Sequence, residues 1–361
     1  MAKVAITNAR VFDDNEILPA TTVVIENGII SWIGSDHEHT EGAIIVDAKN
    51  SVLIPGLIDA HVHLHGPESL QQLAEYGVTS ACDMATWPST LVASLREAAA
   101  EGGIADFKTP GIIACSPSSM HSHMPGYLSE EAVASSEDAA KFVQRRVDEG
   151  VDYIKVIADL PGFDQSVLNA LITEAKKHGK QTIAHAAHAA AFARALEAKV
   201  DVVTHTPMDE TLHASTLQTM LTQHVIVVPT LTMMENVPKL NRPGMGYAPA
   251  KATVTAMYKA GIPILAGTDS NAAPGVPAHV KHGESMHHEL ELLVDAGMSS
   301  LDALRAGTSL PAKYFDLGDR GIIAVGKRAD LVLLKDDPIE DIKATRTIQR
   351  IWCKGIELNM H

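Results

Sequence analysis

The chain has 361 residues, of which 46% are hydrophobic and 20% are charged, and its formal net charge is −15 at pH 7. This length suits one large α/β domain with an accessory unit, and the composition is that of a globular protein. The acidic balance argues against sequence-independent binding to nucleic acid, because such binding needs a basic patch that meets the phosphates.

The cysteines and the N-terminal segment bear on the location of the protein. Cys82, Cys115 and Cys353 lie far apart and form no CxxC pair, which predicts no disulfide framework and favours a reducing compartment. Residues 1–10 lack the apolar run of a signal peptide, and no apolar segment approaches the length of a membrane span. We therefore expect a cytoplasmic protein with no membrane partner.

The first part of the chain, residues 1–51, alternates short strand-like runs with turn residues such as Asn27-Gly28. The segment is too short to bury a sheet by itself, so it must pack against another part of the chain. The expected strands cover residues 4–6, 22–25, 29–33 and 43–46.

One pattern then recurs from Val52 to Gly297: an apolar burst, a polar or Gly/Pro loop, an amphipathic helix and a glycine, which suits the position that ends a helix. Such alternation predicts a closed (β/α)8 TIM barrel over residues 52–320. The alternative, an open doubly wound sheet, would carry a Gly-rich phosphate turn after an early strand, and the sequence has none. The eight bursts cover residues 52–60, 79–84, 111–116, 153–158, 181–186, 202–206, 225–231 and 264–270.

The C-terminal part, residues 321–361, returns to the pattern of the N-terminal part. Its strand candidates are residues 330–334 and 348–353. We therefore expect residues 1–51 and 321–361 to form one small β-sandwich beside the barrel.

Side chains that can bind metal stand in or at the end of several bursts. His61 and His63 are spaced i, i+2, so on a strand they point to the same face. Strand ends of a barrel meet around one axis, so further histidine and aspartate side chains at other strand ends can converge on one metal site. Taken singly, each could instead be an ordinary core residue, a lysine with a buried stem or a loop cap. The further candidates are Lys155, His185, His205 and Asp269.

This ordered set resembles the amidohydrolase superfamily of metal-dependent hydrolases. The resemblance rests on Gly-Leu-Ile-Asp-Ala-His-Val-His at residues 56–63 and on Gly-Thr-Asp-Ser at residues 267–270, and it extends to the segment 326–334. Residues 152–156 and 282–297 are similar to the branch that holds Xaa-Pro dipeptidases and ochratoxinase-like amidases.

The resemblance implies two divalent metal ions, with zinc as the expected metal. His61, His63 and Asp269 would hold the first ion, His185 and His205 the second, and Lys155, carboxylated by CO2, would bridge them. It further implies that a metal-bridged hydroxide attacks the substrate carbonyl, with Asp269 as the catalytic proton carrier. The substrate does not transfer with the resemblance, because the loops that set specificity depart from the branch pattern. The reaction that we expect is hydrolysis of the amide bond of an N-acyl amino acid or dipeptide-like small molecule. Relatives of this architecture commonly assemble, so a homo-oligomer is compatible with the resemblance.

Three further histidines are candidates for substrate binding. His121 and His123 follow the third burst and so belong to the rim of the expected site, although both could be polar loop residues. His188 lies one turn beyond His185 and is a candidate for a substrate contact or a buried hydrogen bond. The roles of the remaining histidines near the site stay open, namely His65, His282, His287 and His288.

Other functions remain as alternatives. A lactone, ester, carbamate or cyclic-amide hydrolase would use the same metal site. The deaminases of the superfamily place a glutamate soon after the fifth-strand histidine, and residues 186–191 contain none. A non-catalytic binding protein would lack some of the ligands, whereas this sequence has all of them.

Overall fold

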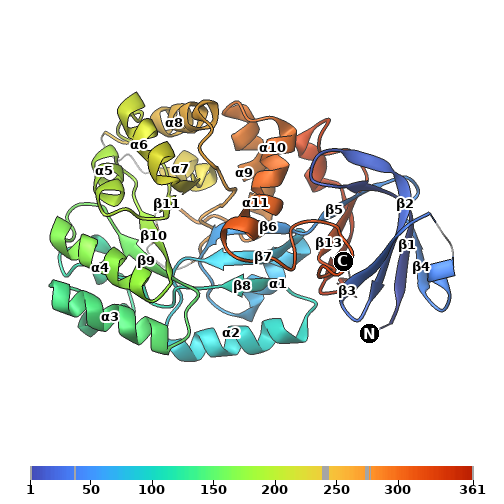
Figure 1. Ribbon diagram of the computed structural model, residues 1–361, viewed down its shortest axis with the longest axis horizontal. Coiled ribbons are helices and arrows are strands. Elements are labelled where there is room, and N and C mark those ends of the chain that lie inside the picture. Colours follow the sequence, from blue (N-terminus) through green and yellow to red (C-terminus); the bar gives the residue numbers. More distant parts are fainter. Residues whose placement is uncertain (1, 36–37, 238–243, 273–275, 277, 360–361) are drawn as a thin grey trace.

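The structure is a computed structural model that describes residues 2–35, 38–237, 244–272, 276 and 278–359. Figure 1 shows two parts side by side, one built from strands and helices and one formed by a sheet that holds both ends of the chain. The first part is an α/β fold with parallel sheets, as the sequence predicts. Cys82, Cys115 and Cys353 are buried and unpaired, in agreement with the expected absence of a disulfide framework.

The terminal sheet has eight strands in the order β15-β14-β13-β5-β1-β2-β3, with β4 paired to β1. Each strand expected in the two flanks is present, and β13 pairs antiparallel with β5, which joins the C-terminal segment to the N-terminal one. The strands are β1 (Val4–Phe12), β2 (Ile17–Glu26), β3 (Ile29–Gly34), β4 (Ile44–Asp47), β5 (Val52–Pro55), β13 (Leu331–Leu334), β14 (Ile348–Cys353) and β15 (Ile356–Glu357).

The first apolar burst, residues 52–60, is two strands rather than one. Its first half is β5 of the terminal sheet, and after Gly56 the chain continues as β6 (Leu57–Val62), which pairs with β7 instead. A Cβ atom at Gly56 would lie 2.1 Å from Thr79 Oγ1, so only glycine lets the chain pass there. Both halves are buried, and hydrophobicity therefore gives no sign of the break. The boundary expected between residues 51 and 52 is consequently wrong, because Val52–Pro55 belong to the terminal sheet.

Two parallel sheets form the centre of the α/β part. One has the order β6-β7-β8 and the other the order β12-β11-β10-β9. Their strands, besides β6, are β7 (Val78–Asp83), β8 (Asp106–Lys108), β9 (Tyr153–Ile157), β10 (Gln181–His185), β11 (Val202–Thr204) and β12 (Ile226–Val228).

The third and eighth bursts do not form regular strands. Residues 111–116 and 264–270 are fully described, yet they pair only through isolated parallel bridges. The bridges join Ala114 to Val156, Val227 to Ile264 and Val62 to Ser270. Gly111, at the start of the first segment, and Asp269, near the end of the second, have positive φ angles and so depart from extended backbone.

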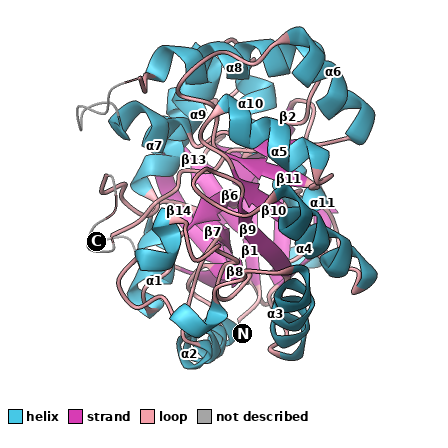
Figure 2. Cartoon of the chain, turned by 90° about the vertical axis from the view of Figure 1, so that its left-hand side faces the viewer, coloured by secondary structure: helices cyan, strands magenta, loops and turns pink. Residues whose placement is uncertain are grey.

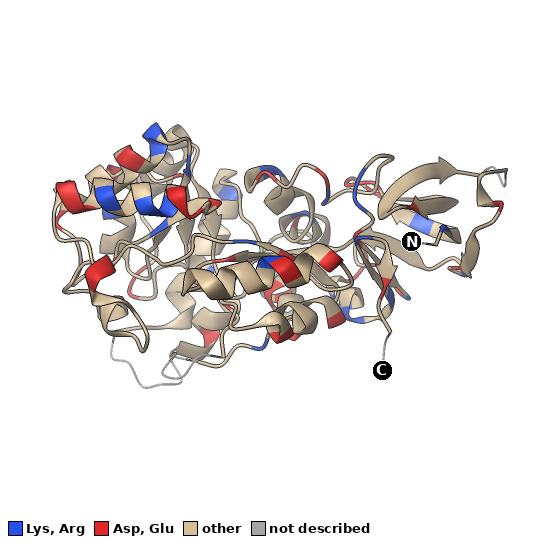
Figure 3. Ribbon diagram, turned by 90° about the horizontal axis from the view of Figure 1, so that it is seen from below, with Lys and Arg blue, Asp and Glu red and all other residues tan. Residues whose placement is uncertain are grey.

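Helices surround the strands (Figure 2). Lys and Arg are interspersed with Asp and Glu on these helices in Figure 3, as expected for solvated outer faces. No helix in the described ranges is both long and apolar enough to cross a membrane. The helices are α1 (Pro67–Glu75), α2 (Ser89–Glu101), α3 (Ser136–Asp148), α4 (Gln165–Lys177), α5 (Ala189–Glu197), α6 (Ala214–Gln223), α7 (Leu231–Asn236), α8 (Tyr247–Ala260), α9 (Glu284–Asp295), α10 (Ser300–Ala306) and α11 (Ser309–Tyr314).

Candidate active site

The structure brings His61, His63 and Asp269 together. His61 lies in β6, His63 follows this strand, and Asp269 comes from the segment that pairs with it. Asp269 Oδ1 lies 3.4 Å from His61 Nε2 and 3.0 Å from His63 Nε2. The possible ligand atoms of the three side chains all lie within 4.8 Å of one another. These residues can therefore hold one metal ion.

The other two histidines of the predicted set lie directly beside this group. The ring of His205 is 4.9 Å from that of His61 and 4.3 Å from that of His185, measured between centroids. His205 Nδ1 is also 3.9 Å from Asp269 Oδ2. His205 thus connects the first group to His185.

Lys155 is buried in β9, and its side chain is held from a strand two places away in the same sheet. Its Nζ donates a hydrogen bond of 2.5 Å to Thr204 Oγ1 in β11. No carboxylate oxygen of the described residues lies within 4.0 Å of this nitrogen. Burial lowers the pKa of Lys155 from 10.5 to about 7, although Asp269 and Asp83 act in the opposite direction. A buried amine of this kind is readily deprotonated, which is the form that reacts with CO2.

The electrostatics of the cluster suit a divalent cation. Burial lowers the pKa of His61 to about 3 and that of His205 well below its usual value, so both imidazoles are neutral and keep a lone pair. Burial raises the pKa of Asp269, but the adjacent His61, His63 and His205 hold it well below its usual value. His61 Nδ1 is buried and has no hydrogen-bond partner among the described residues. Neutral imidazoles around an ionised carboxylate form the nitrogen and oxygen donor set that zinc prefers.

Two of these residues have unusual backbone conformations. His205 and Asp269 have φ angles of 74° and 57°, in the left-handed region that non-glycine residues seldom adopt. Thr230, whose Oγ1 is 2.8 Å from His205 Nδ1, has a φ of 50°. Strain of this kind persists only where the surrounding structure holds it, and it is concentrated at functional sites.

The three histidines expected to bind substrate have different surroundings. The ring of His121 lies 4.7 Å from that of His185, and burial lowers the pKa of His121 to about 3. His188 Nδ1 lies 3.5 Å from Asp159 Oδ2, and this hydrogen bond raises the pKa of His188. His123 is exposed and its Nδ1 contacts Ser119 O at 2.9 Å in the same loop. His121 therefore adjoins His185 and His188 shares the Asp159 carboxylate with it, whereas His123 contacts only its own loop among the described residues.

Asp59 is a supporting residue that the sequence analysis missed. Its carboxylate accepts hydrogen bonds from His61 N (3.1 Å), Thr268 N (3.0 Å) and Thr268 Oγ1 (2.7 Å), and so ties β6 to the segment that carries Asp269. Gly267 allows this close approach, because a Cβ there would lie 2.8 Å from His61 N. A charged residue in the apolar run before His61 was the signal available in the sequence.

Asp159 is a second residue that was missed. It follows β9, and its Oδ2 lies 3.2 Å from His185 Nε2. Burial raises the pKa of Asp159, but His185 and His188 hold it well below its usual value. The rule that selected strand-end histidines would have found this carboxylate as well.

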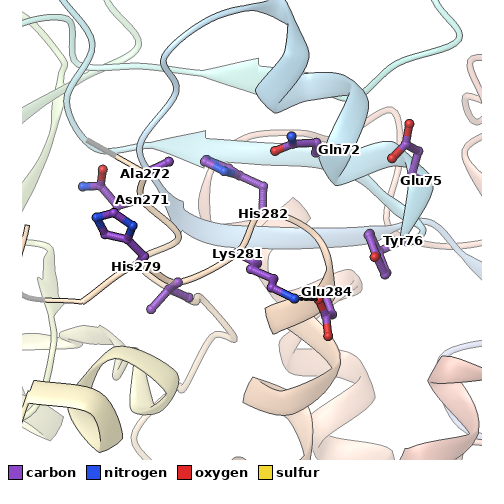
Figure 4. A pocket seen from close by; sticks show the side chains of 10 residues that line it. Gln72, Glu75, Tyr76, Asn271, Ala272, His279, Lys281, His282 and Glu284 are labelled. Atoms are coloured by element: carbon purple, nitrogen blue, oxygen red, sulfur yellow. Dashed lines mark hydrogen bonds and ion pairs between the residues drawn. The ribbon is translucent and has the colours of Figure 1, made fainter. Parts of the chain in front are cut away.

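Two of the histidines left open by the sequence lie next to the site. His282 Nε2 donates to His63 O at 2.9 Å, and His65 Nε2 contacts Asn271 Oδ1 at 2.9 Å. His282 and Asn271 also line a cavity of about 430 Å3 between α1 and the start of α9 (Figure 4). His287 and His288 lie farther along α9, where they contact Thr345 and Glu235.

Comparisons with known proteins identify the family. The sequence profile described as "Amidohydrolase family" matches residues 52–357, so the chain belongs to the amidohydrolase family and is a hydrolase of that superfamily. This confirms the resemblance on which the sequence interpretation rests.

The similar proteins include hydrolases with several substrates. An ochratoxinase of Aspergillus niger is 23% identical over an alignment that covers 98% of this chain and 86% of that protein. An adenine deaminase of Bacillus licheniformis is 23% identical and covers 96% of this chain but 57% of its own length. The crystal structure of a Xaa-Pro dipeptidase with bound methionine in the active site superposes with a TM-score of 0.85 at 22% identity, covering 99% of this chain and 100% of that one. At this identity the superposition shows a shared fold.

Proposed function

We propose that this chain is a binuclear metal-dependent amidohydrolase that cleaves the amide bond of an N-acyl amino acid or a dipeptide-like molecule. The convergence of His61, His63 and Asp269 within 4.8 Å is the observation that carries the proposal. The similarity to an ochratoxinase and a Xaa-Pro dipeptidase supports the choice of substrate class.

We further propose that the two parallel sheets close into a (β/α)8 barrel, with a β-sandwich made by the two termini. The parallel bridges of the third and eighth segments support closure, since they lie where neighbouring strands of a barrel would meet. The buried apolar cluster that includes Ile6, Val23, Leu331 and Trp352 supports a separate core for the terminal part. The barrel would then span residues 56–320.

The proposed metal ligands are the six residues of the sequence analysis. His61, His63 and Asp269 would hold one ion and His185 and His205 the other, with carboxylated Lys155 between them. Bound zinc would lower the pKa of water so that hydroxide forms near neutral pH, and would polarise the amide carbonyl.

Asp269 is the residue that moves the proton in this proposal. Hydrolysis adds water across the C–N bond, so one proton must pass from the attacking water to the leaving nitrogen. Asp269 is ionised and adjoins both histidine groups, which allows it to accept this proton and then to donate it. Its two carboxylate oxygens face different histidines, so that proton transfer requires no large movement.

The rim supports a substrate with a carboxylate and an apolar part. His188 has a raised pKa and can meet a substrate carboxylate, while the ring of His121 adjoins that of His185. Met120 and Leu160 are 69% and 61% exposed. In the sequence, Met120 precedes His121 and Leu160 follows Asp159, and both His121 and Asp159 contact His185. Exposed apolar side chains beside a polar site are suited to an apolar substrate group.

The alternatives differ in how well the site supports them. A lactone, ester, carbamate or cyclic-amide hydrolase would use the same six ligands, and substrate tests must separate these activities. Deamination is less well supported, because no glutamate follows His185 in residues 186–191.

The test combines metal content with activity. Purified protein is expected to hold about two zinc ions per chain and to hydrolyse N-acyl amino acids or Xaa-Pro dipeptides within a panel that also holds esters, lactones and aminopurines. Lys155→Ala should lose the second ion and reduce kcat by at least about 100-fold. After chelation, activity should return with zinc and bicarbonate together and only poorly with zinc alone. Metal-free protein with no activity on the panel would overturn the proposal.

A further inference from the structure

The carboxylate of Asp159 lies between the end of β9 and the loop that follows β10. Its Oδ2 lies 3.2 Å from His185 Nε2 and 3.5 Å from His188 Nδ1, and its Oδ1 accepts a hydrogen bond of 3.0 Å from Ala187 N. The side chain is 16% exposed. Asp159 thus contacts three of the four residues from His185 to His188.

The segment that carries Asp159 is itself anchored to α5. Arg194 of α5 donates a hydrogen bond of 3.0 Å to Ala158 O and another to Phe163 O, at the two ends of the loop around Asp159. The carboxylate is therefore held in place from a helix that begins directly after His188. A fixed acceptor can set the orientation of a ring that hydrogen-bonds to it.

The contact has a consequence for the two ring nitrogens of His185. A carboxylate accepts hydrogen bonds and donates none, so the hydrogen between the two groups belongs to Nε2. A neutral imidazole carries one N–H, so the lone pair is then on Nδ1. Histidines that bind metal commonly donate their other N–H to a carboxylate in this way, which fixes the ring and increases its basicity.

No other described residue outside the proposed ligand set contacts the imidazole ring of a proposed histidine ligand through a carboxylate. His205 contacts a neutral hydroxyl, that of Thr230, and His61 and His63 contact Asp269, which is itself a proposed ligand. Asp59 reaches only the backbone nitrogen of His61. His185 therefore depends on Asp159 in a manner that the other three histidines do not share.

We propose that Asp159 is a positioning residue that holds His185 as the Nε2–H tautomer and presents Nδ1 to the second metal ion. This inference rests on the proposed function, since it takes His185 to be a metal ligand. Asp159 touches neither substrate nor metal in this role. Its effect reaches the reaction through His185 alone.

The first measurement uses the metal-free protein, with 15N-labelled histidine and His185 assigned through His185→Gln. The ring nitrogens of His185 should show the Nε2–H tautomer in the wild-type chain and a mixture of tautomers in Asp159→Asn. A wild-type Nδ1–H tautomer would overturn the inference, whether or not the variant folds.

The second measurement is a titration of the metal-free chain with zinc in the presence of bicarbonate, so that Lys155 can be carboxylated. Asp159→Asn should bind the second ion about 10- to 100-fold more weakly and the first ion as the wild type does. Asp209→Asn is the matched control, because Asp209 also accepts a hydrogen bond at the start of α5, from Ala189 N at 3.0 Å. This control should bind both ions with wild-type affinity. Equal affinities in Asp159→Asn and wild type would overturn the inference.

A third variant, His185→Ala, distinguishes a failure of the positioning role of Asp159 from a failure of the proposed binuclear site. If it loses the second ion while Asp159→Asn keeps it, the positioning role is wrong and the binuclear site stands. If the wild-type chain takes up fewer than two ions, the proposed binuclear function fails and the inference fails with it.

Discussion

The two halves of the candidate site are built in different ways. In the first half, the rings of His61 and His63 turn toward Asp269, so the group is completed by its own members. In the second half, each side chain is hydrogen-bonded to a residue outside the proposed ligand set. The pairs are Lys155 with Thr204, His185 with Asp159, and His205 with Thr230.

This difference indicates how each half is kept in place. The first half needs only that β6 and the segment 264–270 lie side by side, which Asp59 ensures. The side chains of the second half are held by residues of other segments, namely Thr204 in β11, Asp159 after β9 and Thr230 at the start of α7. We therefore expect substitutions outside the ligand set to affect the second half more than the first.

The largest expected effect comes from Asp269, whose carboxylate contacts histidines of both halves. Asp269→Asn removes the charge shared by His61, His63 and His205 and the group proposed to carry the proton. It should lower kcat/KM by about 10³-fold or more and reduce zinc binding to both sites. Kinetics and metal content measure the effect, with the thermal transition as the control for folding. Activity within tenfold of the wild type would contradict the proposed role.

An intermediate effect is expected from Glu289, which supports the second half from a distance. Its buried carboxyl group accepts hydrogen bonds from Leu231 N and Thr232 N in the first turn of α7, directly after Thr230. Burial raises the pKa of Glu289 from 4.5 to about 8, against the effect of these hydrogen bonds. Between pH 4.5 and pH 8 the folded chain therefore holds a proton that the unfolded chain releases. The contribution of Glu289 to the free energy of unfolding falls as pH rises through this window.

Urea unfolding at pH 5, 6.5 and 8 measures how the free energy of unfolding changes with pH. As pH rises from 5 to 8, the free energy of unfolding of the wild-type chain should fall by up to a few kcal/mol because of Glu289. Each unit of difference between the folded and unfolded pKa is worth about 1.4 kcal/mol. Glu289→Gln should remove most of that loss, whereas Glu340→Gln, at an exposed position, should retain it. Parallel slopes in the wild type and Glu289→Gln would show that Glu289 is ionised in the folded chain.

The smallest expected effect concerns the rim beside the second half. Met120→Ser should raise KM about threefold to tenfold for substrates with a large apolar group, because about 1 kcal/mol of apolar contact is lost. It should leave kcat and metal content unchanged. Val325→Ser is the control, since Val325 is 60% exposed and lies in the segment before the terminal sheet strand β13. An equal change of KM in both variants would exclude a specific contact at Met120.

The sequence predicted the parts of the structure that depend on local patterns. Alternating apolar runs marked the strands of both flanks, and strand ends marked His61, His185 and His205. The division at Gly56 was not predicted, because β5 and β6 are equally buried and differ only in their hydrogen-bond partners.

The supporting residues were harder to predict than the ligands. Thr204 and Thr230 act through contacts between segments far apart in sequence, and nothing in their local sequence distinguishes them from loop or strand residues. Asp159 follows a strand as the selected histidines do, but its partner His185 is identified only by the structure. Geometry was equally necessary for His121 and His123, which share one loop, although only His121 reaches His185.

The single residue between β5 and β6 also bears on how the chain folds as it is synthesised. β5 runs through Gly56 into the strand that carries His61, yet its partner β13 is Leu331–Leu334. Nearly the whole chain must therefore leave the ribosome before the sheet behind His61 is complete. Pairing between such distant segments is slow, because a long loop must close first. The earliest of the proposed metal ligands in the sequence is thus among the last to gain its full structural support.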